Sequence, residues 1–152
     1  MLKRALQFAM VAAAACGGDA PKPPPPPSTE LEVSSVYLVL PAGQSPAALY
    51  ATLWNGTSGD DTLRQVRTAV TNPVMLHSPM PSMTMIDALP VPADRTTRLA
   101  PGGAHGMIEG LAGFARGDSV RMTFHFASGR VVVAHAHVIA YADVDSAAPP
   151  IR

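Results

Sequence analysis

The sequence predicts an all-β protein, an antiparallel β-sandwich with Greek-key connections. Sixteen prolines and twelve glycines among 152 residues divide the chain into short segments and disfavour a helical bundle. Hydrophobic residues make up 47% of the chain and charged residues only 14%, which is enough apolar material for one buried core. The segments between the breaks are short and rich in β-branched and aromatic residues. About nine such strands in about 110 residues are typical of a two-sheet sandwich.

The expected strands follow one another between turn signals. Asn55-Gly56 and Asn72-Pro73 end two of the early strands, and proline-rich or glycine-rich loops separate the middle ones. The turn around Ser128-Gly129 joins the last two strands in a hairpin. Strands are expected at 31–40, 48–55, 62–70, 74–77, 83–89, 96–100, 105–111, 119–126 and 130–141. No helix is expected after residue 16.

The segments outside the strands predict an exported protein. Residues 1–16 have two early cations followed by an apolar stretch, as in a signal peptide, and small residues lead into Cys16 as in a lipobox. We expect Cys16 to be lipidated. Residues 17–30 contain five consecutive prolines and predict a polyproline II linker. The folded domain is expected at 31–142 and a tail at 143–152. We expect the protein in the periplasm or cell envelope, tethered to a membrane through the lipid.

Several function classes are disfavoured. The formal net charge is zero and no basic stripe is present, so nucleic acid is not expected as a partner. No apolar run reaches the roughly 20 residues that span a bilayer. The sequence has no G-x-S-x-G nucleophile motif, phosphate-binding glycine loop or H-E-x-x-H motif. We therefore expect a binding protein, monomeric and not an enzyme.

The candidate site is a concentration of soft metal ligands. Residues 75–107 contain five of the eight methionines and two of the five histidines, and the chain's one cysteine lies far outside this stretch. Thioether and neutral imidazole ligands suit Cu(I), and thioethers do not form disulfides in an exported protein. Only the histidines make such binding sensitive to pH, with weakening expected below about pH 6.5.

Strand periodicity divides these residues into pairs. Residues two apart in a strand share a face, so His105 and Met107 should project together, as should Met83 and Met85. His77 lies at the end of a strand, where its side chain can reach a site. The remaining methionines are assigned differently: Met80 and Met85 are kept as reserve ligands, and Met75 and Met122 are assigned to the core because they lie in apolar runs.

A second histidine group lies in the final hairpin. Pairing around Ser128-Gly129 places His135 opposite Met122 and His137 opposite Val120, with His125 on the other face. His135 and His137 on one face could bind Cu(II) or zinc, or could simply be surface histidines near the end of a sheet.

The spacing of the first group resembles a known family. Twenty-one residues separate Met83 from His105-Gly106-Met107, which is similar to the H-(M)-x10-M-x21-H-x-M signature of the PCuAC periplasmic copper chaperones. The stretches IDALPVPADRTTRLAPGGAH and GDSVRMTFHFASG resemble the same family, so the likeness covers about residues 31–140. The loop after His77 is shorter than in the family, because Met83 follows only six residues later.

The resemblance implies a cupredoxin-like β-sandwich that binds Cu(I) through His77, Met83, His105 and Met107. It further implies delivery of copper to a recipient protein of the respiratory oxidase assembly pathway, for the copper centre of cytochrome c oxidase. Two alternatives stay open on the sequence. One is copper scavenging or storage at the envelope, and the other is a metal-free sandwich that serves as an interaction module.

Overall fold

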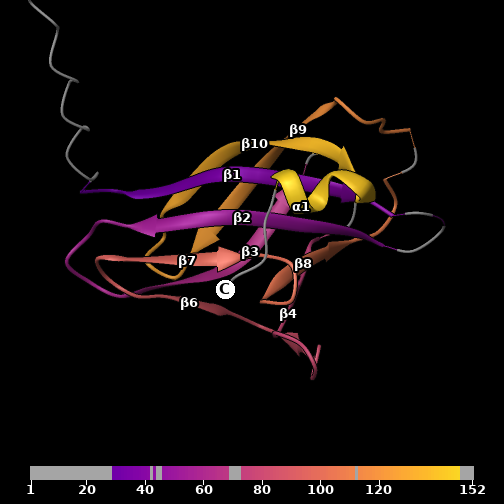
Figure 1. The fold of residues 1–152 in the computed structure, drawn as a ribbon. Helices are drawn as coiled ribbons and strands as arrows, with labels where there is room; N and C mark the ends of the chain where they lie inside the picture. Colours follow the sequence, from indigo (N-terminus) through magenta and orange to yellow (C-terminus); the bar gives the residue numbers. More distant parts are fainter. Residues whose placement is uncertain (1–28, 42, 44–45, 69–72, 112, 148–152) are drawn as a thin grey trace, which may run out of the picture.

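The computed structural model describes residues 29–147 except 42, 44–45, 69–72 and 112. The predicted leader with Cys16, and the linker as far as residue 28, lie outside the described residues. The elements, shown in Figure 1, are β1 (Leu31–Leu40), β2 (Ala47–Asn55), β3 (Asp61–Thr68), β4 (Met75–His77), β5 (Met85–Ile86), β6 (Leu89–Val91), β7 (Arg95–Leu99), β8 (His105–Ile108), β9 (Ser119–Phe126), β10 (Val131–Ala140), the 3₁₀ turn η1 (Tyr141–Asp143) and α1 (Val144–Ala147). None of the described helices is long and apolar enough to cross a membrane.

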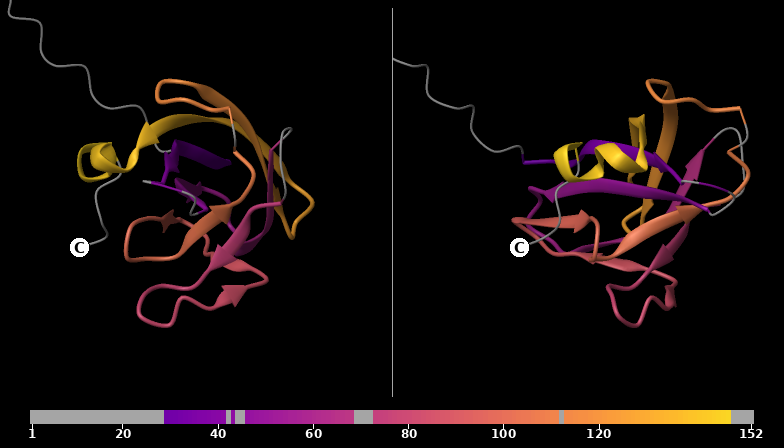
Figure 2. Two further views of the ribbon diagram at one scale, coloured as in Figure 1. Left: turned by 90° about the vertical axis from the view of Figure 1, so that its right-hand side faces the viewer. Right: turned by 45° about the vertical axis from the view of Figure 1, so that its right-hand side comes forward.

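The ten strands form one strongly curved sheet. Its order is β5-β4-β8-β2-β1-β10-β9-β3-β6, and β7 pairs with the second half of β2. Figure 2 shows the sheet wrapping round on itself, and β6 returns to lie beside β7. All pairings are antiparallel except that of β1 with β10, which is parallel. The predicted sandwich is therefore confirmed, with one parallel pair that the sequence did not indicate.

The core lies inside this curved sheet. Along β2 every second residue is buried, and β9 alternates in the same way, with Met122 and Phe124 fully buried. Burial of one face along an amphipathic strand fixes its register, because a slip of one residue would turn every apolar side chain outward. Met122 belongs to the core, as predicted.

A buried asparagine organises the turn after β2. Asn55 is completely buried, and its Nδ2 donates hydrogen bonds to the carbonyl oxygens of Gly59 (3.0 Å) and Val91 (2.8 Å). Its Oδ1 accepts from the backbone N–H and the hydroxyl of Thr57. The Asn-Gly signal correctly predicted the turn, and the asparagine side chain additionally joins it to β6.

Three local expectations differ from the structure. Residues 89–91 form strand β6 despite Pro90, which is tolerated because β6 is the last strand of the sheet and pairs only with β3 there. A short helical segment, η1 and α1, follows β10 where no helix was expected, and Val144 anchors it by being buried. Met83 lies before β5 rather than in it.

Candidate metal site

The site is built on two short antiparallel strands. In the pairing of β4 with β8, His77 lies directly opposite His105 and Met75 lies directly opposite Met107. Side chains of directly paired residues project to the same side of a sheet. The four side chains therefore share one face, and all four are half-buried there.

The residues between the members of each pair show that the four side chains lie on the outward face of the sheet. Leu76 and Gly106 are paired with each other and are buried against the core. A Cβ atom placed on Gly106 would lie 2.6 Å from Cγ1 of Val74 and 3.0 Å from Cβ of Leu49, so only glycine fits at this position without displacement. Because Gly106 faces inward, His105 and Met107 face outward, as strand periodicity predicted.

The imidazole rings of His77 and His105 lie close together. Their centroids are 5.7 Å apart with an interplanar angle of 69°. Nδ1 of His105 lies 3.0 Å from the carbonyl oxygen of Gly103. Since a carbonyl can only accept, Nδ1 carries the proton in the neutral ring, and the lone pair of Nε2 is left for a ligand. This is the arrangement that orients metal-binding histidines in proteins.

The surroundings of His77 disfavour its protonated form. Burial lowers the pKa of its imidazole, and the neighbouring His105 lowers it further. Its Nδ1 is buried and has no hydrogen-bond partner among the described residues. An unsatisfied buried nitrogen costs free energy, and a bound metal ion would remove that cost. Both features fit a metal ligand, because a metal binds only the neutral imidazole.

A third strand, β5, adds another candidate ligand beside His77 and His105. Met85 in β5 lies directly opposite His77, so His105, His77 and Met85 form a row across three neighbouring strands. Met85 is at the edge of the sheet, with 66% of its side chain exposed.

The loop between β4 and β5 carries the other predicted methionines. The hydroxyl of Ser78 lies 3.0 Å from the hydroxyls of Ser82 and Thr84 and accepts a hydrogen bond from the backbone N–H of Thr84. These bonds close the loop and leave Met80 56% exposed and Met83 42% exposed. Met83 has a φ of 41°, outside the strand region, so it is not paired with Met85 on one strand face as expected.

The structure therefore sorts the predicted residues into two groups. His77, His105 and Met107 come together on one sheet face with Met85 beside them, whereas Met80 and Met83 lie on the adjoining loop. The core assignment of Met75 differs from the structure, in which this residue lies outside the core cluster and opposite Met107. Its position two residues before His77 was a usable signal, since both must share a face of one strand.

Within the described part of the chain, no three His, Cys, Asp or Glu side chains gather in a way that could hold a metal ion. Zinc, calcium and magnesium sites of the ordinary kinds need such groups. A metal at this face would have to accept thioether ligands.

The second histidine group is placed differently from the prediction. In the β9–β10 hairpin His135 lies opposite Arg121 and His137 opposite Ser119, one residue away from the predicted register. His125 lies opposite Val131 and therefore shares the outer face with the other two histidines instead of the opposite face. The register differs because the hairpin closes between Phe126, whose N–H donates to the carbonyl oxygen of Arg130, and Arg130 itself, so the loop contains three residues (127–129) instead of the predicted two.

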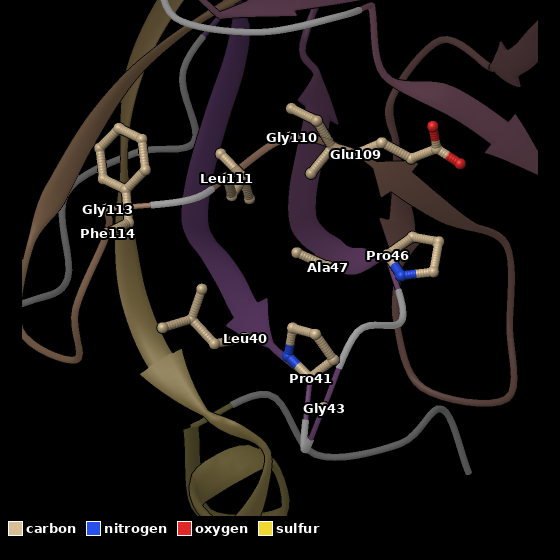
Figure 3. Close-up of a pocket in the computed structure, with 11 residues that line it drawn as sticks. Leu40, Pro41, Gly43, Pro46, Ala47, Glu109, Gly110, Leu111, Gly113 and Phe114 are labelled. Atoms are coloured by element: carbon tan, nitrogen blue, oxygen red, sulfur yellow. The ribbon is translucent and has the colours of Figure 1, made fainter.

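A separate cavity of about 630 Å³ lies at the other end of β8, between the ends of β1 and β2 and the loop after β8 (Figure 3). Leu40, Ile108, Leu111 and Phe114 give it apolar walls, and Glu109 is the one charged residue that lines it. Among the described residues, no histidine or methionine lines this cavity, so it is distinct from the candidate metal site.

Comparisons with known proteins bear on this geometry. The LpqE-like family model, which describes lipoproteins, matches residues 31–138. The chain belongs to the LpqE-like family. No curated protein sequence matches it.

Solved structures similar to this LpqE-like domain include PCuAC domains. The copper-bound PCuAC domain from PmoF2 superposes with a TM-score of 0.64 and 26% identity, covering 73% of this chain and 93% of that one. The apo PCuAC domain from PmoF1 gives a TM-score of 0.65 and 25% identity, covering 73% and 94%. The Cu(I)-bound solution structure of DR1885 from Deinococcus radiodurans gives 0.58 and 26%, covering 72% and 76%. The predicted likeness to PCuAC domains and their cupredoxin-like fold is confirmed.

Proposed function

We propose that this protein is a copper chaperone of the bacterial cell envelope that holds Cu(I) through methionine and histidine side chains. The observation that carries the proposal is the pairing of His77 with His105 on the same outward face as Met107. Met83, at the family's spacing from His105, is the proposed loop ligand, with Met80 and Met85 in reserve. Similar domains of known structure include copper-bound and Cu(I)-bound forms.

The chemistry of the side chains supports Cu(I) as the cargo. Every proposed donor is uncharged, and thioether sulfur is a soft ligand that favours Cu(I) over Zn²⁺ or Mg²⁺. The lowered pKa of His77 keeps its imidazole in the binding form, and the bond from His105 to Gly103 leaves one nitrogen of that ring free. Binding at this face needs no deprotonation of a thiol.

Exposure supports transfer rather than permanent retention. The loop methionines Met80 and Met83 and the edge residue Met85 are all substantially exposed, so a recipient's ligands can approach the metal while it is still bound. Copper would then pass by stepwise ligand exchange to a partner with stronger donors. The proposed activity is binding and delivery, with no catalytic step.

The location and the recipient are part of the same proposal. The LpqE-like family is described as a lipoprotein family, which agrees with lipidation at Cys16 and a proline-rich tether to the membrane. The proposed recipient is a protein of the respiratory oxidase assembly pathway, for the copper centre of cytochrome c oxidase. Deleting the protein and measuring oxidase activity under copper limitation tests delivery: lower activity supports it, and unchanged activity favours scavenging or storage.

Copper binding itself is tested by titrating the full-length chain with Cu(I) against a competing chelator. The proposal predicts about one equivalent bound by the wild type and a sharp loss of affinity in the Met83→Leu, Met107→Leu double variant. Met122→Leu makes the same chemical change in the core and should leave binding unchanged, since Met122 is fully buried. Undiminished binding by the double variant would refute the proposed site.

A further inference from the structure

The second row of the β4–β8 pairing contains a thioether, that of Met75, which the signature motif does not include. Met75 lies directly opposite Met107, just as His77 lies opposite His105 one row further along. Directly paired residues have Cβ atoms about 4.5–5.5 Å apart, and residues two apart on one strand are about 6.6 Å apart. Two imidazoles and two thioethers thus occupy the corners of a small rectangle on one face.

Met75 is not explained by packing. It is half-buried, and it belongs neither to the core cluster nor to the partly buried hydrophobic side chains packed against that cluster. Met122, in contrast, is fully buried in the core. The strand neighbour Leu76 takes the inward position on β4 and is buried, which leaves Met75 to point outward with His77.

Of the two residues paired with Met107 on neighbouring strands, Met75 of β4 is the one that carries a thioether. On the other side of Met107 the paired residue is Ala48 of β2, which has no donor atom. Met83, the methionine that the motif selects, lies on the loop with 42% of its side chain exposed and a backbone outside the strand region. Donors on paired strands are held in place more firmly than donors on a loop, so they are better suited to define a metal geometry.

We infer that Met75 is a Cu(I) ligand, and that Met75, His77, His105 and Met107 form a four-donor N2S2 site carried entirely by β4 and β8. This inference rests on the proposed function and deepens it. The exposed methionines of the loop and of β5 then serve the exchange of copper with a partner, while the strand residues define the resting site. Two neutral nitrogens and two thioether sulfurs make an uncharged, soft donor set of the kind that suits Cu(I).

The test compares Met75→Leu with wild type and with Met122→Leu in the full-length chain, using Cu(I) affinity and X-ray absorption of the copper-loaded protein. We expect Met75→Leu to bind Cu(I) at least about tenfold more weakly and to lose one sulfur from the copper coordination shell. Met122→Leu should match the wild type in both measurements. The effect of Met75→Leu should be larger in a Met83→Leu background, where the loop thioether of Met83 can no longer replace that of Met75.

The outcomes separate the two claims. A wild-type chain that binds Cu(I) together with a Met75→Leu variant of equal affinity and equal sulfur count overturns the inference and leaves the proposed function standing. A wild-type chain that binds no Cu(I) overturns both. Thermal unfolding of the metal-free variants identifies loss of fold: we expect Met75→Leu to unfold at the wild-type temperature, because the side chain it replaces lies outside the core.

Discussion

Replacing Gly106 with alanine tests whether the outward face of β8 depends on the close packing of its inward face. The added methyl would lie 2.6 Å from Cγ1 of Val74, a buried and β-branched side chain, and 3.0 Å from Cβ of Leu49, which moves only with its backbone. Neither neighbour can rotate away. Overpacking of this kind costs about 1–3 kcal/mol, and the stiffer unfolded chain of an alanine variant offsets about 0.4–1 kcal/mol.

The net expectation is that Gly106→Ala lowers the free energy of unfolding by about 1–2 kcal/mol. At about 4 °C per kcal/mol for a domain of this size, the unfolding temperature should fall by about 4–8 °C. Circular dichroism during heating, with urea unfolding as a second measurement, gives both quantities. Because β8 must shift to relieve the contact, the pairing of His105 with His77 should be disturbed and Cu(I) affinity should fall as well.

Gly59→Ala is the matched control. A Cβ atom at Gly59 would meet nothing within 4 Å, so this variant should be as stable as wild type or slightly more stable. If Gly106→Ala unfolds at the same temperature as Gly59→Ala, the close packing behind β8 is not a constraint and the reasoning is refuted.

Two further predictions concern the turns. Burial alone would raise the pKa of Asp61, but hydrogen bonds from Ser128 and Thr62, with the charge of Arg130, lower it overall. The ionised carboxylate therefore stabilises the fold above about pH 3.8, and this contribution disappears as the pH falls through the lower folded-state pKa. In urea unfolding, Asp61→Asn should lower the free energy of unfolding by about 1–2 kcal/mol at pH 7 and by less below pH 3.8. A difference between variant and wild type that stays constant across that pH range would contradict this account. Asn55→Ala should cost about 1–3 kcal/mol in the same assay, because it leaves the buried carbonyl oxygen of Val91 without its donor, and a cost near zero would mean that water replaces the side chain.

Much of the fold followed from the sequence because its signals are local. The Asn-Gly turn and the hairpin around Ser128-Gly129 each depend on neighbouring residues, and the structure has both. The parallel pairing of β1 with β10 joins strands about 100 residues apart in sequence, and nothing local encodes it. The short strand β6 was missed because its proline reads as a loop signal, although an edge strand tolerates proline.

The candidate site was predictable in composition but not in arrangement. The expectation that His105 and Met107 project from the same face of their strand depended only on strand periodicity, and it is confirmed. Met75 was assigned to the core because it lies in an apolar run, although its spacing of two from His77 places both residues on one strand face. That Met75 lies opposite Met107 depends on the register of β4 against β8, which joins distant segments and is not encoded locally. The error at Met83 arose because the segment was read as one strand, whereas the serine and threonine hydroxyls of the loop bend the chain there.

The measurement that tests the central claim most directly is the shift in unfolding temperature of the full-length chain at controlled free Cu(I). A ligand that binds only the folded state stabilises it by about 2.7 kcal/mol at a free concentration one hundred times its Kd. The account predicts an unfolding temperature that rises steadily with free Cu(I), and a rise that is largely lost in the Met83→Leu, Met107→Leu variant. An unfolding temperature that does not change with Cu(I) would contradict the account and favour a metal-free interaction module.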